Sequence, residues 1–163
     1  MKTLNLLLAS SDRRSANLVQ VVVLDACYNQ AAVQTIRTSR MDELIGLGCR
    51  DGIDLIVLTP NHLQSGGKSG ASAVTVEDVA QAVGTLKRYS VRPAIAVDVR
   101  AQDEMLFRNA GIDGVFCFPF DGGALKARVR RLLRLEDSPQ PLRAEKPSLA
   151  GLLLRGFQRL KSA

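Results

Sequence analysis

The chain has 163 residues, of which 46% are hydrophobic and 23% are charged, and its formal net charge is +6. These values are typical of a soluble globular chain that is long enough for one well-packed domain with some residues to spare. No apolar run is long enough to span a bilayer, and the N-terminus lacks a cleavable signal pattern, so we expect a cytoplasmic protein.

Apolar runs separated by capping and turn signals divide residues 3–135 into ten alternating elements. Strands are predicted at residues 4–9, 32–38, 53–58, 94–97 and 115–118. Helices are predicted at residues 13–26, from Ser39 to the glycines at 46 and 48, from Thr75 through Leu86, at residues 102–110, and after Asp121 through Leu133. This alternation predicts an α/β fold of the (βα)5 type, with a five-stranded parallel sheet and helices on both faces.

Polar residues supply the predicted helix caps. Residues 10–12 form a capping cluster before the first helix, and capping boxes are predicted at Ser39 with Asp42 and at Thr75 with Asp78. In a parallel α/β sheet, the residues that bind ligands usually lie at the carboxyl ends of the strands. The residues predicted to lie there are Ser10, Ser11, Asp12, Thr38, Thr59, Asp98 and Phe118.

A Gly-Lys-Ser triplet at residues 67–69 raises the question of a phosphate-binding loop. The motif G-x-x-x-x-G-K-[ST] would need its first glycine at residue 62, where the sequence has His62. The next helix is predicted to begin at Thr75, so it could not hold a phosphate at Ser69. Residues 60–74 are therefore predicted to be a loop that binds no nucleotide.

Cysteines and cationic residues suggest no further chemistry. Cys27, Cys49 and Cys117 lack metal-ligand spacing, and we expect them to be buried, reduced thiols. The segment 121–135 is basic, which could mark a nucleic-acid surface or a solvated helix face. Because only 4% of residues are aromatic, nucleic-acid binding is the less favoured of the two. The cations in this segment are Lys126, Arg128, Arg130, Arg131 and Arg134.

Three stretches resemble the receiver domain of two-component response regulators, over residues 3–135. They are AGIDGVFCFPFDGGALKARVRRLLR at 110–134, GIDLIVLTP at 52–60 and RPAIAVDV at 92–99. The resemblance implies the flavodoxin-like fold and a cis bond between Phe118 and Pro119. Receivers accept a phosphoryl group on an aspartate, with an acid pair that holds Mg²⁺, a hydroxyl that senses the phosphate and a lysine.

The positions that carry this chemistry in receivers are all changed in this chain. The acid pair falls on Ser10 and Ser11, with Asp12 beside them, and the acceptor falls on Thr59. The sensing hydroxyl falls on Asp98, and the lysine on Phe118, which we expect to be buried. Serine is a weak Mg²⁺ ligand, and threonine is a poor nucleophile without a base. We therefore expect a degenerate form, a pseudo-receiver that is not an enzyme and needs no metal or other cofactor.

The resemblance places partner contact and possible homodimerisation on the fourth helix, fifth strand and fifth helix, residues 102–135. The residues expected to contribute are Leu125, Arg128 and Arg131. The predicted function is phosphorylation-independent regulation or scaffolding through contact with a protein of a signalling or assembly system. The alternative is an unconventional phosphoryl acceptor or small-ligand sensor that uses Asp12, Thr59 and Asp98.

The chain is predicted to continue beyond the domain at residues 1–135 with a proline-containing linker at 136–147 and an amphipathic helix at 148–163. The apolar residues of this helix fall on one face. The segment could dock on its own domain, bind a partner groove or lie on an anionic membrane surface. The residues on the apolar face are Leu149, Leu152, Leu153, Phe157 and Leu160.

Overall fold

The computed structural model describes residues 1–66, 74–90 and 92–135. The predicted linker, the predicted C-terminal amphipathic helix, and residues 67–73 of the predicted loop, which include its Gly-Lys-Ser triplet, lie outside the described residues. What was predicted for these segments therefore remains a prediction.

Five parallel strands form one sheet in the order β2-β1-β3-β4-β5, which confirms the predicted architecture. Strand β1 pairs with β2 over eight residues and with β3 on its other side, and β5 closes the sheet beyond β4. Residues 6–9 of β1 and 56–58 of β3 pair with a strand on each side. These central residues are apolar and buried, as expected where helices cover both faces of the sheet. The strands are β1 (Lys2–Ala9), β2 (Ala31–Thr38), β3 (Leu55–Leu58), β4 (Ala94–Val99) and β5 (Gly114–Cys117).

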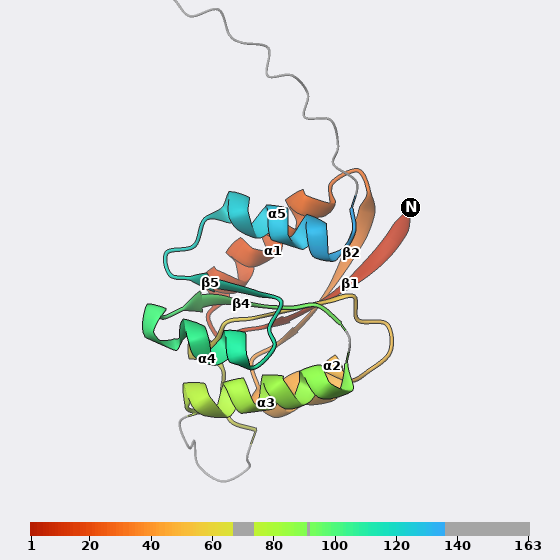
Figure 1. The fold of residues 1–163 in the computed structure, drawn as a ribbon. Helices are drawn as coiled ribbons and strands as arrows, with labels where there is room; N and C mark the ends of the chain where they lie inside the picture. The colour runs from red at the N-terminus through yellow and green to blue at the C-terminus, as the bar shows by residue number, and fades with distance from the viewer. Residues whose placement is uncertain (67–73, 91, 136–163) are drawn as a thin grey trace, which may run out of the picture.

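Helices cover both faces of the sheet, with α1 and α5 on one face and α2, α3 and α4 on the other (Figure 1). Two short 3-10 turns, Pro60–His62 after β3 and Ala101–Asp103 before α4, complete the order. The helices are α1 (Arg13–Cys27), α2 (Met41–Gly48), α3 (Val76–Tyr89), α4 (Glu104–Asn109) and α5 (Gly122–Leu132). Within the described part of the chain, no helix is both long enough and apolar enough to cross a bilayer.

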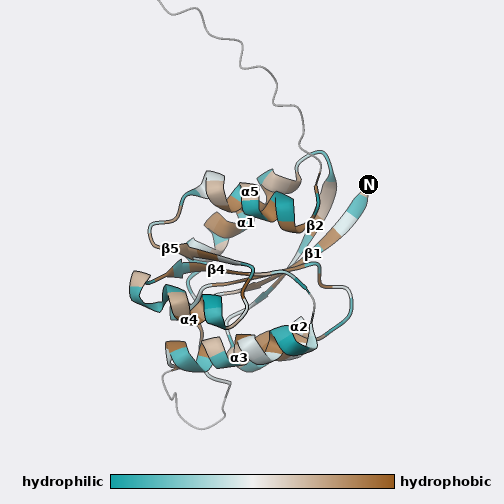
Figure 2. Ribbon diagram, in the orientation of Figure 1, coloured by the Kyte–Doolittle hydropathy of each residue, from teal (hydrophilic) through white to brown (hydrophobic). Residues whose placement is uncertain are grey.

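Side chains that alternate along the strands build two separate cores. On β1, Leu6 and Leu8 pack under α1 and α5, whereas Leu7 packs under α2 and α3. The α3 helix contributes Val83 and α4 contributes Phe107 to this second core, and both are fully buried. Figure 2 shows the same pattern, with hydrophobic strands in the middle and mixed colours on the helices. The strands are apolar on both sides because each side faces a helix layer.

The capping predictions had mixed outcomes. Thr75 and Asp78 form the predicted capping box at the start of α3, so that prediction is confirmed. The box at Ser39 and Asp42 was wrong, because α2 begins one residue later with Arg40 at its N-cap and without a side-chain cap. The Asp42 carboxylate binds the Arg40 guanidinium instead, at 2.6 and 3.1 Å.

Strand β4 contains an irregularity that the sequence did not predict. Its register against β5 shifts between Val97 and Val99, and the intervening Asp98 has a φ of 58°. Left-handed backbone is uncommon for residues other than glycine, although aspartate tolerates it better than most. The irregularity sets the backbone of Asp98 at the carboxyl end of the sheet, where the side chain meets the first turn of α1.

Candidate functional site

The carboxyl ends of β1, β3 and β4 bring together Ser10, Thr59 and Asp98, as the sequence predicted for a parallel sheet. Ser10 is held by its own backbone, whose N–H donates to the carbonyl of Thr38 at 2.9 Å. Thr59 is held in the same way by a 3.0 Å bond to the carbonyl of Ala9. Backbone hydrogen bonds therefore hold the main chain of both residues in place at the ends of their strands.

The Thr59 side chain is fully buried, and its Oγ1 donates to Oγ of Ser10 at 2.6 Å. The Ser10 hydroxyl is also 3.2 Å from the backbone N–H of Asp12. A threonine becomes a nucleophile when a neighbouring base removes its proton. Here the partner of the Thr59 proton is a neutral serine hydroxyl, which is not a base at ordinary pH. The arrangement at the acceptor position is that of a structural hydrogen bond.

Asp12, Ser15 and Asp98 form a second polar group beside this hydroxyl pair. The Ser15 Oγ lies 2.7 Å from Oδ2 of Asp12 and 2.6 Å from Oδ2 of Asp98. One hydroxyl has one proton, so it can donate to only one of the two carboxylates at a time. Ser15 therefore joins the end of β4 to the first turn of α1.

Asp12 is the N-cap of α1, which confirms the capping cluster predicted at residues 10–12 and identifies its capping residue. Its carboxylate accepts from the backbone N–H groups of Arg14 and Ser15, at 3.2 and 3.1 Å. The hydrogen bond from the Ser15 hydroxyl, followed by these backbone bonds, lowers the pKa of Asp12 below its ordinary value of 3.8. The charge of His62 acts in the same direction. Asp12 is thus held as a carboxylate.

Sequence reasoning missed Ser15, Asn61 and His62, all of which belong to this end of the sheet. The Asn61 side chain donates to the carbonyl of Asp98 at 3.0 Å, and the His62 carbonyl accepts from the N–H of Ser11 at 2.5 Å. Ser15 lies three residues after Asp12 and could have been recognised as a first-turn position that faces its N-cap. No sequence signal distinguishes the other two.

Phe118 contradicts its prediction, because its side chain is 74% exposed instead of buried in the site. Its backbone N–H donates to the carbonyl of Val99 at 3.0 Å, which fixes the end of β5 while the ring faces solvent. The expected cis bond to Pro119 is confirmed. The position to which the resemblance assigns the receiver lysine therefore carries an exposed aromatic side chain.

The described carboxylates at this end of the sheet do not form a group of metal ligands. Within residues 1–66, 74–90 and 92–135, no group of three or more His, Cys, Asp or Glu side chains is placed to hold a metal ion. A groove of about 700 Å³ lies between α3 and α4, with Gln81, Gly84, Arg88 and Asn109 among its lining residues. None of the residues at the carboxyl ends of the strands lines this groove.

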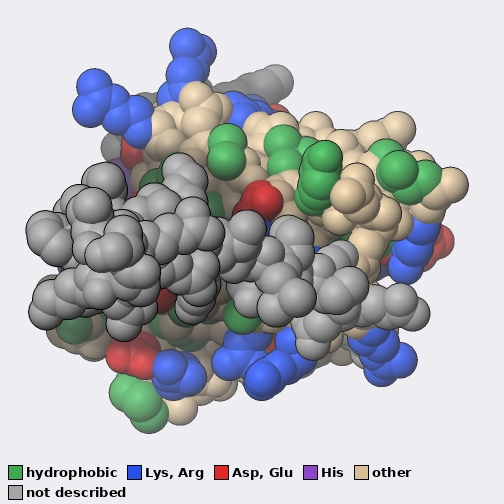
Figure 3. Space-filling model, turned by 90° about the horizontal axis from the view of Figure 1, so that it is seen from above, with side chains coloured by type: hydrophobic (Ala, Val, Ile, Leu, Met, Phe, Trp, Pro, Cys, Tyr) green, Lys and Arg blue, Asp and Glu red, His purple; other side chains and the backbone are tan. Residues whose placement is uncertain are grey.

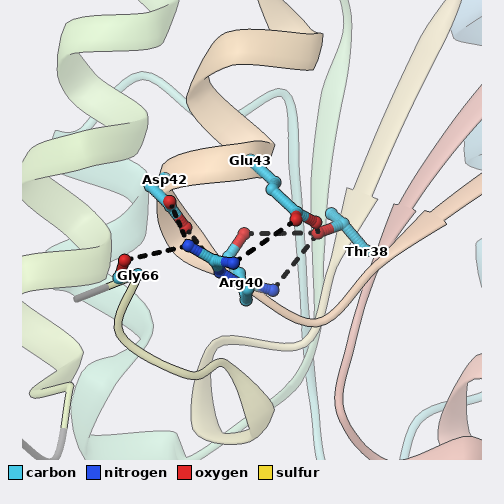
Figure 4. A network of polar contacts seen from close by, with 5 residues as sticks. All are labelled: Thr38, Arg40, Asp42, Glu43 and Gly66. Atoms are coloured by element: carbon cyan, nitrogen blue, oxygen red, sulfur yellow. Dashed lines mark hydrogen bonds and ion pairs between the residues drawn. The ribbon is translucent and has the colours of Figure 1, made fainter. Parts of the chain in front are cut away.

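The segment after β3 is anchored to the start of α2 by Arg40 (Figure 4). Arg40 donates to the carbonyl of Gly66 at 2.9 Å and pairs with Asp42. Thr38 donates to Glu43 at 2.6 Å, which orders the same turn. A side chain at residue 66 would overlap the carboxylate of Asp42 in its present position, so the carboxylate would have to move. The anchored segment ends immediately before the Gly-Lys-Ser triplet.

The predicted interaction residues on α5 differ in exposure. Leu125 is fully buried, so its assignment to a contact surface was wrong; it faces the core below α1. Arg128 is half-buried and Arg131 is exposed. Lys126 pairs with Asp25 at 2.6 Å, and Arg130 donates to the carbonyl of Ala26 at 2.9 Å. Part of the positive charge of α5 is therefore engaged in contacts with α1.

The three cysteines differ from the prediction that all are buried. Cys27 is buried, Cys117 is half-buried and Cys49 is exposed. Burial raises the pKa of the Cys27 thiol, and burial together with the nearby Glu104 carboxylate raises that of Cys117. A raised pKa lowers the thiolate fraction, so these two thiols are weak nucleophiles.

No family model and no curated protein matches this sequence. Solved structures do resemble the chain in fold. A protein named as a pilus assembly protein, CpaE of Burkholderia thailandensis, is 22% identical with a TM-score of 0.53, over 80% of this chain and 98% of its own. The response regulator CheY4 of Vibrio cholerae is 16% identical with a TM-score of 0.55, over 80% and 99%.

A third similar structure is the receiver domain of the sensor histidine kinase PA1611 of Pseudomonas aeruginosa, which holds a magnesium ion in its active-site cleft. It is 11% identical, with a TM-score of 0.59, over 81% of this chain and 98% of its own. Identities this low show the fold alone. The chain therefore has a receiver-like domain with the flavodoxin-like architecture, as its sequence predicted.

Proposed function

We propose that this chain is a phosphorylation-independent pseudo-receiver, a non-enzymatic regulatory or scaffolding domain that works through protein–protein contact. The observation that carries this proposal is the bond between Thr59 and Ser10. The Thr59 hydroxyl, at the position expected for the acceptor, is fully buried and donates its hydrogen bond to the neutral hydroxyl of Ser10. A phosphoryl donor would have to displace this bond and reach a hydroxyl whose hydrogen-bond partner, among the described residues, is a neutral hydroxyl and not a base.

The contact surface that we propose comprises α4, the end of β5 and α5. Two large apolar side chains are exposed on this stretch, Met105 on α4 and Phe118 after β5. They lie on adjoining elements, because Oε2 of Glu104 is 3.6 Å from Sγ of Cys117, and these residues immediately precede Met105 and Phe118. Exposed aromatic and methionine side chains are enriched at protein interfaces. Arg131, also exposed, supplies a cation on the same stretch.

The kind of partner that we propose is a component of a signalling or assembly system. Support comes from the fold likeness to response regulators and to a protein named for pilus assembly. Homodimerisation through the same surface is part of this proposal. Nucleic acid is a less favoured partner, because part of the charge on α5 is engaged by Asp25 and by the carbonyl of Ala26.

An unconventional phosphoryl acceptor or small-ligand sensor remains the second candidate. The observation that favours it is the pair of carboxylates, Asp12 and Asp98, bridged by the Ser15 hydroxyl. Carboxylate oxygens are ligands for Mg²⁺, and a carboxylate can itself accept a phosphoryl group.

Acetyl phosphate with Mg²⁺, followed by intact-mass measurement, separates the two candidates. The pseudo-receiver proposal expects an unchanged mass. A stoichiometric adduct would favour the second candidate, and its loss in Thr59→Val, Asp12→Asn or Asp98→Asn would identify the acceptor.

The contact surface is tested independently with the double variant Met105→Ser, Phe118→Ser. We expect it to weaken binding to any protein captured by the wild-type chain, or to weaken self-association in sedimentation. The matched control is Tyr89→Ser, which removes a similarly exposed aromatic side chain from the end of α3. Equal binding by the double variant and the control would reject this surface.

A further inference from the structure

The outer face of α1 carries an apolar stripe that the sequence analysis did not identify. Its members, here called the α1 stripe, are Leu18, Val21, Leu24 and Tyr28, which are 53%, 61%, 43% and 71% exposed. Their spacing of three, three and four residues places them on one side of a helix and its C-cap. Figure 3, which looks onto the side of the molecule formed by α1 and α5, shows apolar side chains exposed there.

The α1 stripe is not an extension of the core. The core side of α1 is made by Ala16, Val19, Val23, Ala26 and Cys27, all of which are buried. Within residues 1–66, 74–90 and 92–135, the four stripe residues remain among the exposed large apolar side chains. Burial of large apolar side chains is favourable, so an exposed row of them favours an occupant.

The described chain ends beside this stripe. Helix α5 packs along α1, with Lys126 bound to Asp25 and Arg130 bound to the carbonyl of Ala26. Leu135, the last described residue, packs against the same core cluster as Ala26, and its N–H donates to the carbonyl of Arg130. The described chain therefore ends close to the C-terminal end of α1.

The segment that follows has the composition and reach to cover the stripe. Residues 148–163 carry the five apolar residues already described on one predicted helical face. The twelve residues between, 136–147, span at most about 40 Å when extended, which exceeds the length of about 22 Å for a 15-residue helix. The apolar positions from 149 to 160 would extend about 16 Å on a helix, and the α1 stripe extends about 15 Å.

We propose that residues 148–163 dock with their apolar face on the α1 stripe of the same chain. This inference goes beyond the proposed function and does not depend on it, because it concerns the outer face of α1 and not Met105 or Phe118. The sequence left three uses open for this segment: docking on its own domain, binding a partner groove, or lying on an anionic membrane surface. The proposal selects the first.

Tethering is the reason to prefer this segment over a second copy of the chain. An ordinary stable interface buries about 800 Å² on each partner, more than four side chains on one helix supply. A segment joined by a short linker faces its site at an effective concentration of the order of millimolar, so a small contact suffices.

Disulfide trapping in the full chain tests the contact directly. The test variant is Val21→Cys with Leu153→Cys, in a chain whose Cys49 and Cys117 are replaced by serine; the buried Cys27 is kept. The matched control is Met105→Cys with Leu153→Cys, because Met105 is 62% exposed and Val21 is 61% exposed, on different helix layers. Under mild oxidation at low protein concentration, we expect the intramolecular Val21 cross-link to form about tenfold faster than the control.

Equal rates for the two pairs would overturn the proposal. A cross-link that joins two chains, with a yield that rises with protein concentration, would also overturn it in favour of a second copy as the occupant. Peptide mapping by mass spectrometry distinguishes these outcomes.

Hydrogen exchange supplies a second measurement that does not alter the C-terminal segment. We expect the backbone amides of residues 148–163 to exchange more slowly in the wild-type chain than in the variant Val21→Asp, Leu24→Asp. Met105→Asp, on the other helix layer, should leave their exchange unchanged. Exchange in the wild-type chain as fast as in an unstructured peptide, or a variant indistinguishable from wild type, would overturn the proposal.

Discussion

The Oγ1 of Thr59 donates a 2.6 Å hydrogen bond to Oγ of Ser10, which joins the carboxyl ends of β3 and β1. The resemblance to receivers assigns the phosphoryl acceptor to Thr59 and one of the metal-binding acids to Ser10. In this chain the two hydroxyl groups are hydrogen-bonded to each other. The four predictions below test this contact and the contacts and exposure of other described residues.

Replacing Thr59 with a charged residue should lower the free energy of unfolding more than replacing it with an isosteric apolar residue. Thr59→Val keeps the shape and loses one hydrogen bond, so we expect the free energy of unfolding to fall by about 1 kcal/mol. Thr59→Asp places a carboxylate in a fully buried site whose known partner is one hydroxyl, so we expect a loss of about 3 kcal/mol or more at pH 7. Urea unfolding measures both. If Thr59→Asp were as stable as Thr59→Val, the site would be far more open than described.

The Ser15 hydroxyl should control the pKa of Asp12. Ser15→Ala removes the largest cause of the lowered value, so we expect this pKa to rise toward 3.8 in a carboxyl-carbon NMR titration. Because the folded pKa is depressed, the stability contributed by Asp12 is present above its ordinary value and is lost as pH falls through the folded value. The variant should therefore lose less stability than wild type on acidification below pH 4.

Asp78 provides the internal reference for this titration. Its pKa is lowered by the hydroxyl and backbone of Thr75, at the start of a different helix. Ser15→Ala should leave the Asp78 titration unchanged. A shift of both aspartates would indicate a general change of fold instead of the loss of one hydrogen bond.

Phe118→Lys should be nearly neutral for stability. Because the ring is exposed, a lysine at this position would keep its charge in water. We therefore expect the free energy of unfolding to change by no more than about 0.5 kcal/mol. This revises the larger loss that follows from the expectation of a buried Phe118. The contrasting variant is Phe107→Ala, a fully buried residue, for which about 3–5 kcal/mol is expected. Thermal or urea unfolding of the two variants side by side checks the exposure of Phe118.

Gly66 and Asp42 should be energetically coupled. A methyl group at residue 66 would overlap the Asp42 carboxylate and disturb its pairing with Arg40. We expect Gly66→Ala to destabilise the wild-type chain by about 1 kcal/mol, and by clearly less in an Asp42→Ala background. Asp42→Ala alone should cost no more than about 1 kcal/mol, because the ion pair is partly exposed. Additive effects of the two substitutions would refute the close approach.

The order of the elements and the fold could be predicted from the sequence because both follow from local patterns. Apolar runs set the strands, and side chains at Asp12, Thr75 and Asp121 mark helix starts that the structure confirms. The failed cap at Ser39 has a different cause. Arg40 competes for the Asp42 carboxylate, and a capping pattern in the sequence does not include such a rival.

Exposure was harder to predict than secondary structure. Leu125 and Phe118 are both apolar residues in the stretch that was expected to meet a partner, yet one is fully buried and the other is exposed. The difference depends on how α5 rotates against α1 and on where the chain turns after β5. The α1 stripe was missed for a related reason. A helix with apolar residues on two sides gives a weak periodic signal, and only the packed sheet shows which side is covered.

The left-handed backbone at Asp98 limits which side chains the end of β4 can accept. A β-branched residue such as threonine at a φ of 58° is strained by about 1–2 kcal/mol, whereas aspartate tolerates this conformation better. A hydroxyl-bearing threonine, of the kind that the resemblance assigns to this position, would therefore carry a backbone cost at residue 98. Within the described residues, positions 10, 59 and 118 carry no such cost, because their backbones are not left-handed.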